Sequence, residues 1–293
     1  MPTPVMLMRK VSTERRGVIV AILGLGQTVS WAGSYYIPAI LFRPMAAELG
    51  VSEVWLFGLF SLSLTCSALV GPAAGLMIDR QGGRGVLLAS NLVLAVGLGI
   101  CAMSTTLAAL ALAWIVLGIG MGMGLYEAAF ATAARYYGKD ARGMITGITL
   151  IAGFASTVSW PISGALEAQF GWRVTCLIWM AAHVMIALPL HACLPTSPVT
   201  DVSAATDRPT GSVDRRALWI LSFIFAVAAF TSTAMATHLP AILTAAGASA
   251  VVAIGAGALI GPSQVVARIS EHVFFRKRHP IFATRLGFAA HPI

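Results

Sequence analysis

Three side chains that can bind or release a proton lie inside long apolar segments: Glu127, His183 and Tyr126. An ionisable group inside a membrane is energetically costly, so each is a candidate for handling protons or substrate. Glu127 can take up a proton at one membrane face and release it at the other, or pair with a cationic substrate. A structural hydrogen bond to a neighbouring helix is the alternative for Glu127, and likewise for His183.

The position of Glu127 indicates its depth and its direction. It stands eight residues before Arg135, which places it roughly 12 Å inside a hydrocarbon core about 30 Å thick. Gly120, Gly124 and Ala131 share its helical face. Small residues on that face predict that the carboxylate points to packed protein or a central cavity rather than to lipid.

The first apolar segment carries polar and aromatic side chains that can line a substrate site. Gln27 and Trp31 are the two that lie deep enough to contact a substrate. Tyr35 and Tyr36 stand closer to Arg43, where an aromatic belt at the membrane surface explains them equally well. The sequence shows no catalytic serine arrangement and no ligand spacing that predicts a metal site. A transport site is therefore a better hypothesis than an active site.

These side chains lie in a strongly apolar chain. Hydrophobic residues make up 58% of it, charged residues 10%, and the mean hydropathy is +0.84, which no water-soluble fold accommodates. We predict an all-α polytopic membrane protein, because the uncharged stretches reach the roughly 20 residues that cross a bilayer. Polar breaks at 104–106 and 244–249 divide the two longest stretches. Eight complete spans result, near 17–41, 54–78, 85–103, 107–134, 143–166, 174–194, 217–243 and 250–267. A partial ninth begins near Ile281.

The basic residues predict the orientation of the spans. Of the 19 lysines and arginines, all but Arg43 and Arg173 fall in alternate turns. By the positive-inside rule, the N-terminus, the turns 79–84 and 135–142 and the linker 195–216 face the cytoplasm. The net charge of +8 then reflects topology and attraction to anionic lipid headgroups, and we expect no nucleic-acid partner. The predicted location is the plasma (inner) membrane.

The chain divides at a polar linker. Residues 195–216, rich in proline, aspartate and glycine, separate a six-helix bundle at 1–194 from an incomplete C-terminal bundle at 217–293. The second part restarts in the manner of the first, because the letters Pro-Ala-Ile-Leu end both span one, at 38–41, and span seven, at 240–243. The matching order predicts a parallel internal repeat.

The turn after the second span carries the sharpest motif. Its glycines and charged residues are Gly75, Asp79, Arg80, Gly82 and Arg84. Apart from Gly83, which replaces one basic residue, they resemble the loop signature of the major facilitator superfamily of secondary transporters. The resemblance implies a turn that helps to latch one conformation of the transport cycle. Physically, Gly75 permits close helix approach, Asp79 offers charge to an arginine or a helix end, and Gly82 permits a tight turn.

The fifth span carries a second, partial likeness. Its small and helix-bending residues are Gly147, Gly153, Pro161 and Gly164. They resemble the motif of proton-coupled exporters in this superfamily, with Trp160 where that motif has a glycine. Close helix packing around a proline kink explains them equally well. Residues 170–173 resemble the family's outer turn before the sixth helix, and Trp172 is expected to anchor at the membrane interface.

The resemblance implies two six-helix halves that enclose a substrate site near the midplane. It implies a transporter rather than an enzyme: proton-coupled movement of a small organic solute by alternating access. The partial fifth-span motif leaves export by antiport and simple helix packing as equal alternatives. The expected partners are the lipid bilayer, an unidentified solute and protons. No nucleotide-binding segment stands out, so neither ATP nor another cofactor is expected. Because the second bundle is incomplete, the alternative is a membrane protein without transport activity, a remnant or a half that associates with another chain.

Overall fold

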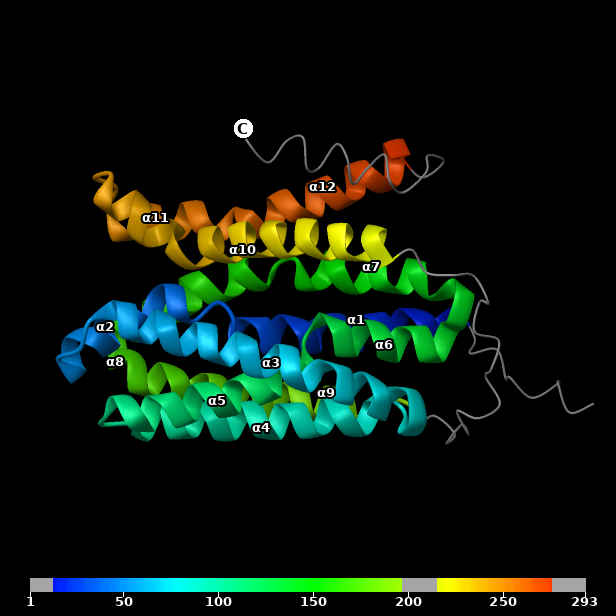
Figure 1. The fold of residues 1–293 in the computed structure, drawn as a ribbon, viewed down its shortest axis with the longest axis horizontal. Helices are drawn as coiled ribbons and strands as arrows, with labels where there is room; N and C mark the ends of the chain where they lie inside the picture. The colour runs from blue at the N-terminus through cyan, green and yellow to red at the C-terminus, as the bar shows by residue number, and fades with distance from the viewer. Residues whose placement is uncertain (1–12, 197–214, 276–293) are drawn as a thin grey trace, which may run out of the picture.

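The computed structural model describes residues 13–196 and 215–275, and every regular element in those ranges is a helix. The helices form an elongated bundle and run roughly along its longest axis (Figure 1). Six segments in the described ranges are long and apolar enough to cross a membrane: Glu53–Gln81, Gly83–Met103, Leu107–Tyr137, Ala141–Ala192, Arg215–Ala245 and Ala250–Ala267. The predicted all-α membrane architecture is confirmed.

Eight spans were predicted, and two features explain the smaller number. The first span is broken between α1 (Thr13–Ala32) and α2 (Pro38–Leu49), and the apolar part of α1, Arg16–Ala32, is too short to be counted as a span. Spans five and six are joined in one 52-residue segment. That segment turns at Gly171, where φ is +77° and a side chain would be strained. Across the turn, Trp179 Nε1 donates a hydrogen bond to Ser163 Oγ at 3.0 Å. The predicted ninth span lies outside the described residues.

The other helices end close to the predicted breaks. They are α3 (Glu53–Gln81), α4 (Gly83–Met103), α5 (Leu107–Gly124), α6 (Tyr126–Tyr137), α7 (Ala141–Ala152), α8 (Ala155–Ala182), the π-helix η2 (His183–Ala187), α9 (Leu188–Ala192), α10 (Arg215–Ala245), α11 (Ala250–Ala258) and α12 (Ile260–Phe275), with a short 3-10 turn, η1 (Gly138–Asp140). Hydroxyl groups cap the starts of three of them, α3 (by Ser52), α5 and α11. Thr106 Oγ1 accepts from the backbone N–H of Ala109 at 3.2 Å, and Ser249 Oγ accepts from that of Val252 at 3.3 Å. The predicted breaks at 104–106 and 244–249 are confirmed.

Helix α5 packs between α3 and α4 through glycines on two faces. A Cβ atom on Gly118 or Gly122 would overlap the backbone of α3. A Cβ on Gly120 or Gly124 would overlap side chains of α4. Ser90 Oγ of α4 donates to the carbonyl of Gly120 at 2.8 Å, which adds a polar bond to the second face. Two pairs of glycines four residues apart therefore set the distances between the three helices.

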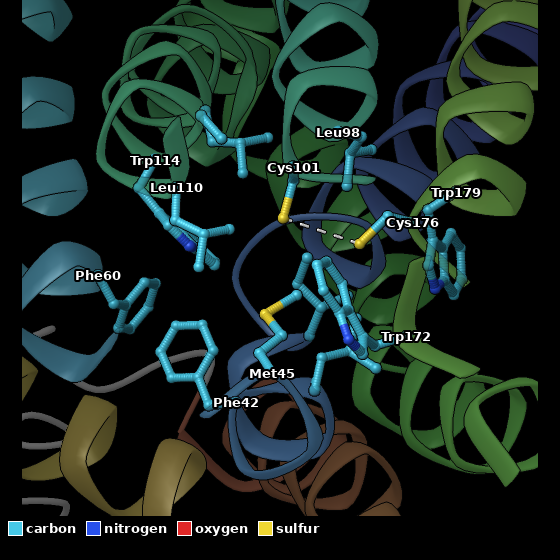
Figure 2. Close-up of a cluster of buried hydrophobic side chains, with 14 of the residues drawn as sticks. Phe42, Met45, Phe60, Leu98, Cys101, Leu110, Trp114, Trp172, Cys176 and Trp179 are labelled. Carbon is cyan, nitrogen blue, oxygen red and sulfur yellow. Dashed lines mark hydrogen bonds between the residues drawn. The ribbon is translucent and has the colours of Figure 1, made fainter. Parts of the chain in front are cut away.

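The interior contains two buried apolar clusters. The first gathers aromatic and sulfur-containing side chains from α2, α3, α4, α5 and α8 (Figure 2). Phe42 and Trp114 meet edge to face with ring centroids 5.1 Å apart. The thiols of Cys101 and Cys176 lie 3.9 Å apart. The second cluster, toward the end of the bundle that carries Arg135, gathers aliphatic side chains from α1, α3, α4 and α7. Together they hold the first six predicted spans as one bundle.

Trp172, predicted at the membrane interface, is instead buried, with 3% of its surface exposed. Its Nε1 donates to Glu48 Oε2 at 2.6 Å, and Arg173 pairs with the other oxygen of the same carboxylate at 2.8 Å. The Arg173 guanidinium also lies 4.0 Å from the centre of the Trp172 ring. The ring is therefore held by protein contacts with α2, which lies far away in the sequence.

Helices α10, α11 and α12 lie together along one edge of the bundle, and α4 and α5 lie at the opposite edge (Figure 1). Contacts with α2, α7 and α8 connect this second part to the first. The two Pro-Ala-Ile-Leu segments differ in backbone: Pro38 begins α2 after a break, whereas Pro240 lies inside the continuous helix α10. The predicted repeat is therefore not a repeat of local helix geometry at these residues.

Candidate functional site

Two helix breaks meet in the first part of the chain. One separates α1 from α2 at residues 33–37, and the other separates α5 from α6 at Leu125. A break leaves backbone groups without their helical partners. Gln27, fully buried on α1, donates from Nε2 to the carbonyl of Gly124 at 2.6 Å. Gln27, which was predicted to contact substrate, thus provides a hydrogen-bond donor for the carbonyl at the end of α5 and connects the two broken spans.

An aromatic cluster surrounds this junction. Its members are Trp31, Tyr35, Tyr36, Phe60, Tyr126, Phe130 and Trp160. The centroid of the Trp31 ring lies 4.7 Å from that of Tyr35 and 4.8 Å from that of Tyr126. Trp31 Nε1 donates to Gln27 Oε1 at 3.2 Å, so the ring is oriented by the residue that spans the breaks. The structure therefore brings the predicted residues Gln27, Trp31 and Tyr126 together.

The cluster extends to the second part of the chain. The hydroxyl groups of Tyr35 and Thr233 on α10 are hydrogen-bonded at 2.6 Å. Trp160 packs so closely on α11 that a Cβ on Gly257 would overlap its ring. Tyr35 and Tyr36, which an aromatic belt explained equally well, belong to the junction of α1, α2 and α10. No local sequence signal distinguishes the two, because the deciding contact is with α10.

Glu127 lies beside this cluster but is exposed. It occupies the first turn of α6, where free backbone N–H groups favour a negative charge. Among the described residues, its carboxylate has no recorded hydrogen bond or ion pair. The break at Leu125 interrupts the helix, so Gly120 and Gly124 do not share a continuous face with it. The argument for an inward direction therefore does not hold, although its place next to Tyr126 does.

His183 lies in a different polar cluster. It is fully buried in the π-helix η2, and its Nδ1 atom lies 3.1 Å from Asn91 Oδ1. The other end of the Asn91 amide, Nδ2, lies 2.7 Å from Nδ1 of the buried residue His191. Sequence reasoning missed Asn91 and His191. An asparagine inside the predicted span 85–103 is the signal that would have found them.

The turn that resembles the family signature is held by an arginine from α6. Arg135 donates to the backbone carbonyls of Asp79 and Arg80 at the end of α3. A cation at this position complements the partial negative charge of a helix C-terminus. Gly82 has a φ of +91° and makes the turn into α4, while the Asp79 side chain is exposed. A Cβ on Gly75 would meet no atom within 4 Å, so the described helices do not use Gly75 for close packing.

The glycines of span five lie against other helices. A Cβ on Gly147 would come within 2.8 Å of the Val20 side chain on α1. Gly153 lies at the junction of α7 and α8, and Gly164 faces Ile254 of α11. Pro161 lies within α8. In this structure these residues make helix contacts, several of them with the second part of the chain.

Apolar helices that are long enough to span a bilayer, with polar and aromatic groups at helix breaks, define a multi-pass membrane protein with the architecture of secondary transporters. Residues 23–293 match the model of the Major Facilitator Superfamily, and the chain belongs to that family. The family consists of transporters and not of enzymes. Among the described residues, no three histidine, cysteine or acidic side chains are grouped as a metal site requires.

Individual relatives are more distant. Over 252 residues the chain is 29% identical to the uncharacterized MFS-type transporters Rv1877 and MT1926 of Mycobacterium tuberculosis strains H37Rv and CDC 1551, and each match covers 85% of this chain. The chain spans 34% of the length of these curated relatives. Among solved structures, a chain of tetrameric PepTSo2 matches with a TM-score of 0.49 and 16% sequence identity. The match covers 93% of this chain and 57% of the PepTSo2 chain. A structure from work on substrate recognition in proton dependent oligopeptide transporters has the same TM-score and identity, covering 92% and 56%.

Proposed function

We propose that this protein moves a small organic solute across the membrane by alternating access, coupled to a proton gradient. The observation that carries the proposal is the bond from Gln27 Nε2 to the Gly124 carbonyl, which joins two broken helices beneath the aromatic cluster. Secondary transporters bind their substrates at discontinuous helices, where unpaired backbone groups and side chains converge. Family membership supports the same activity.

The chemistry of the cluster favours a solute with a cationic group. The faces of Trp31 and Tyr126 carry negative electrostatic potential that attracts a cation, and Glu127 adds a carboxylate one residue beyond Tyr126. Half-buried rings also provide apolar area for the rest of an organic molecule. In this proposal Gln27 and Trp31 orient the solute, and Tyr126 covers it.

Glu127 and His183 are the proposed proton-handling residues. Family members that resemble the span-five pattern of Gly147 and Pro161 export by antiport, so the proposed direction is export in exchange for protons. The basic residues support an N-terminus in the cytoplasm and a location in the plasma (inner) membrane.

The test is transport by the whole chain in proteoliposomes, with ethidium as a fluorescent organic cation. We expect a pH gradient to drive ethidium movement. Trp31→Ala should raise the ethidium concentration at half-maximal transport roughly 2- to 30-fold, as expected from the loss of a cation–π contribution of about 0.5 to 2 kcal/mol. Glu127→Gln should remove the dependence on the gradient, because the amide can neither carry a proton nor pair with a cation.

The matched control is Trp55→Ala. Trp55 is 63% exposed at the start of α3 and forms no ring pair with the aromatic cluster. Its replacement should therefore leave the half-saturating ethidium concentration unchanged. Folding of each variant is checked by circular dichroism and size-exclusion chromatography. A folded protein that moves neither ethidium nor a panel of neutral and anionic solutes under a pH gradient would overturn the proposal.

A further inference from the structure

Asn91, His183 and His191 form a buried polar group that we call the Asn–His cluster. Each has at most 1% of its surface exposed. Asn91 lies on α4, His183 at the start of η2 and His191 on α9. On their far sides, the His191 imidazole lies against Gly26 of α1 and the His183 imidazole against Gly33, just after the end of α1. Three polar side chains buried this deeply among membrane helices indicate a function.

The hydrogen bonds fix the orientation of the Asn91 amide. One of its two terminal atoms lies 2.8 Å from the backbone carbonyl of Leu87. A carbonyl oxygen only accepts hydrogen bonds, so the atom facing it is the amide nitrogen, Nδ2. The same nitrogen lies 2.7 Å from His191 Nδ1, and the amide oxygen faces His183 Nδ1 at 3.1 Å. Asn91 thus presents a donor to one imidazole and an acceptor to the other.

This orientation assigns opposite tautomers to the two rings. His183 must carry its hydrogen on Nδ1 to donate to the amide oxygen, which leaves a lone pair on Nε2. His191 must accept at Nδ1, so its hydrogen is on Nε2. Neither Nε2 atom has a hydrogen-bond partner among the described residues. The ring of His183 therefore has a free site for a proton, and that of His191 does not.

Gly26 on α1 and Gly33, the first residue after α1, make room for the two Nε2 atoms. A Cβ on Gly33 would come within 3.0 Å of His183 Nε2, and a Cβ on Gly26 would overlap His191 Nε2. These glycines stand seven residues apart, roughly 10 Å along a helix. The two Nε2 atoms are therefore separate sites and cannot bind one ion between them.

Other charged groups lie away from the cluster. Of the described ionisable side chains on the neighbouring helices, Arg16 of α1 pairs with Asp140, and Arg84 stands at the start of α4. Those of α8 lie near the turn at Gly171: Glu167, Arg173 and Cys176, the last beside Cys101 of α4. The titratable group that faces the His183 imidazole is His191, and the His191 imidazole also faces the backbone carbonyl of Leu87. Asn91 therefore decides which of them accepts a proton.

We propose that Asn91 is a positioning residue that makes His183 the proton acceptor of this pair and holds His191 neutral. A proton that binds His183 Nε2 leaves the bond from Nδ1 to Asn91 intact. A proton on His191 Nδ1 would place two N–H groups against each other, and the Leu87 carbonyl, which faces both, would have to be shared between Asn91 Nδ2 and the imidazole. This inference rests on the proposed proton coupling, and it names His183 rather than His191 as the site.

The test is nitrogen NMR of the whole chain in nanodiscs with ¹⁵N-labelled histidine, from neutral to acidic pH. His183→Asn and His191→Asn assign the signals. We expect neutral His183 to be protonated at Nδ1 and neutral His191 at Nε2. On acidification, His183 alone should become imidazolium. In Asn91→Asp both carboxylate oxygens accept, so His191 should move its hydrogen to Nδ1 and titrate as well.

Ser90→Ala is the control, because Ser90 is adjacent on α4 but bonds to Gly120 and not to either ring; it should leave both tautomers unchanged. Identical tautomers in the two rings, acidification of His191 in the natural sequence, or unchanged rings in Asn91→Asp would each overturn the inference. The readout is separate from transport. The expected tautomers in a chain without gradient-driven flux would support the inference and contradict only the proposed function.

Discussion

Replacing Gln27 with methionine tests whether the two helix breaks are held together by one side chain. Methionine has a similar length and shape but cannot form either of the hydrogen bonds that Gln27 makes, to the Gly124 carbonyl at 2.6 Å and from Trp31 Nε1 at 3.2 Å. A hydrogen bond between membrane helices contributes about 0.6 kcal/mol on average and at most about 1.7. Two such bonds give an expected loss of roughly 1 to 3 kcal/mol in the free energy of unfolding.

The assay is reversible unfolding in mixed micelles of mild detergent and SDS, followed by circular dichroism. A loss of about 1.4 kcal/mol corresponds to a tenfold change in the folded-to-unfolded ratio. Trp31→Phe removes only the second bond and should show about half of the effect. When Gln27 is already methionine, Trp31→Phe should no longer cost the free energy of the hydrogen bond from Trp31 Nε1, because the acceptor of that bond, Gln27 Oε1, is absent.

Thr28→Val is the matched control. Thr28 is the next residue of α1, and its hydroxyl donates to Gly24 within the same helix at 3.0 Å, so its loss breaks no contact between helices. We expect a change within about 0.5 kcal/mol. If Gln27→Met were as stable as Thr28→Val, the bond to Gly124 would not hold the breaks together and the reasoning would be refuted.

Three further predictions concern packing and the network at Trp172. Gly118→Val should prevent stable folding, seen as loss of the monodisperse peak in size-exclusion chromatography, because its side chain would enter the backbone of α3. Copper phenanthroline should cross-link Cys101 to Cys176, whose sulfur atoms lie 3.9 Å apart, as peptide mass spectrometry would show. Glu48→Ala should lower the free energy of unfolding by about 1 to 3 kcal/mol, because Trp172 Nε1 loses its buried acceptor.

Controls for these variants come from the same bundle. Gly85→Ala on α4 should be tolerated, since a Cβ there meets no atom within 4 Å. Cys66 and Cys193 have no recorded sulfur contact and should not be cross-linked within one chain. Glu48→Gln should lose at most about 1 kcal/mol, because it keeps an acceptor for Trp172 and gives up only the partly exposed pair with Arg173. Equal losses for Glu48→Gln and Glu48→Ala would contradict the assigned role of the Trp172 bond.

The helical architecture could be predicted because its causes are local. Uncharged runs of sufficient length define the spans, and Thr106 and Ser249 mark helix starts by capping groups that sequence shows directly. Gln27, Trp31 and Tyr126 could be named from the sequence as separate candidates, but their contact with one another could not be predicted. Gln27 meets Gly124 across 97 positions of sequence, and no periodicity reports such a contact.

Two of the features that the sequence did not show have one physical cause: a partner that is distant along the chain. The buried hydrogen bond of Trp172 was not anticipated because its acceptor, Glu48, lies 124 positions away. Asn91 and His191 were missed because their hydrogen bonds connect residues about 100 positions apart, and a polar residue in an apolar segment does not by itself indicate its partner. Leu125 itself is neither glycine nor proline, so the sequence did not indicate a break there. The face predicted for Glu127 therefore assumed one helix across a position where two helices meet.

The two glycine pairs of α5 constrain the gene as well as the fold. Each residue turns a helix by about 100°. A single-codon insertion or deletion between Gly118 and Gly124 would rotate one pair away from its partner helix and bring bulky side chains against α3 or α4. The connecting turns carry no such angular requirement. Length variation among descendants of this sequence is therefore expected in the turns, while the number of codons across α5 stays fixed.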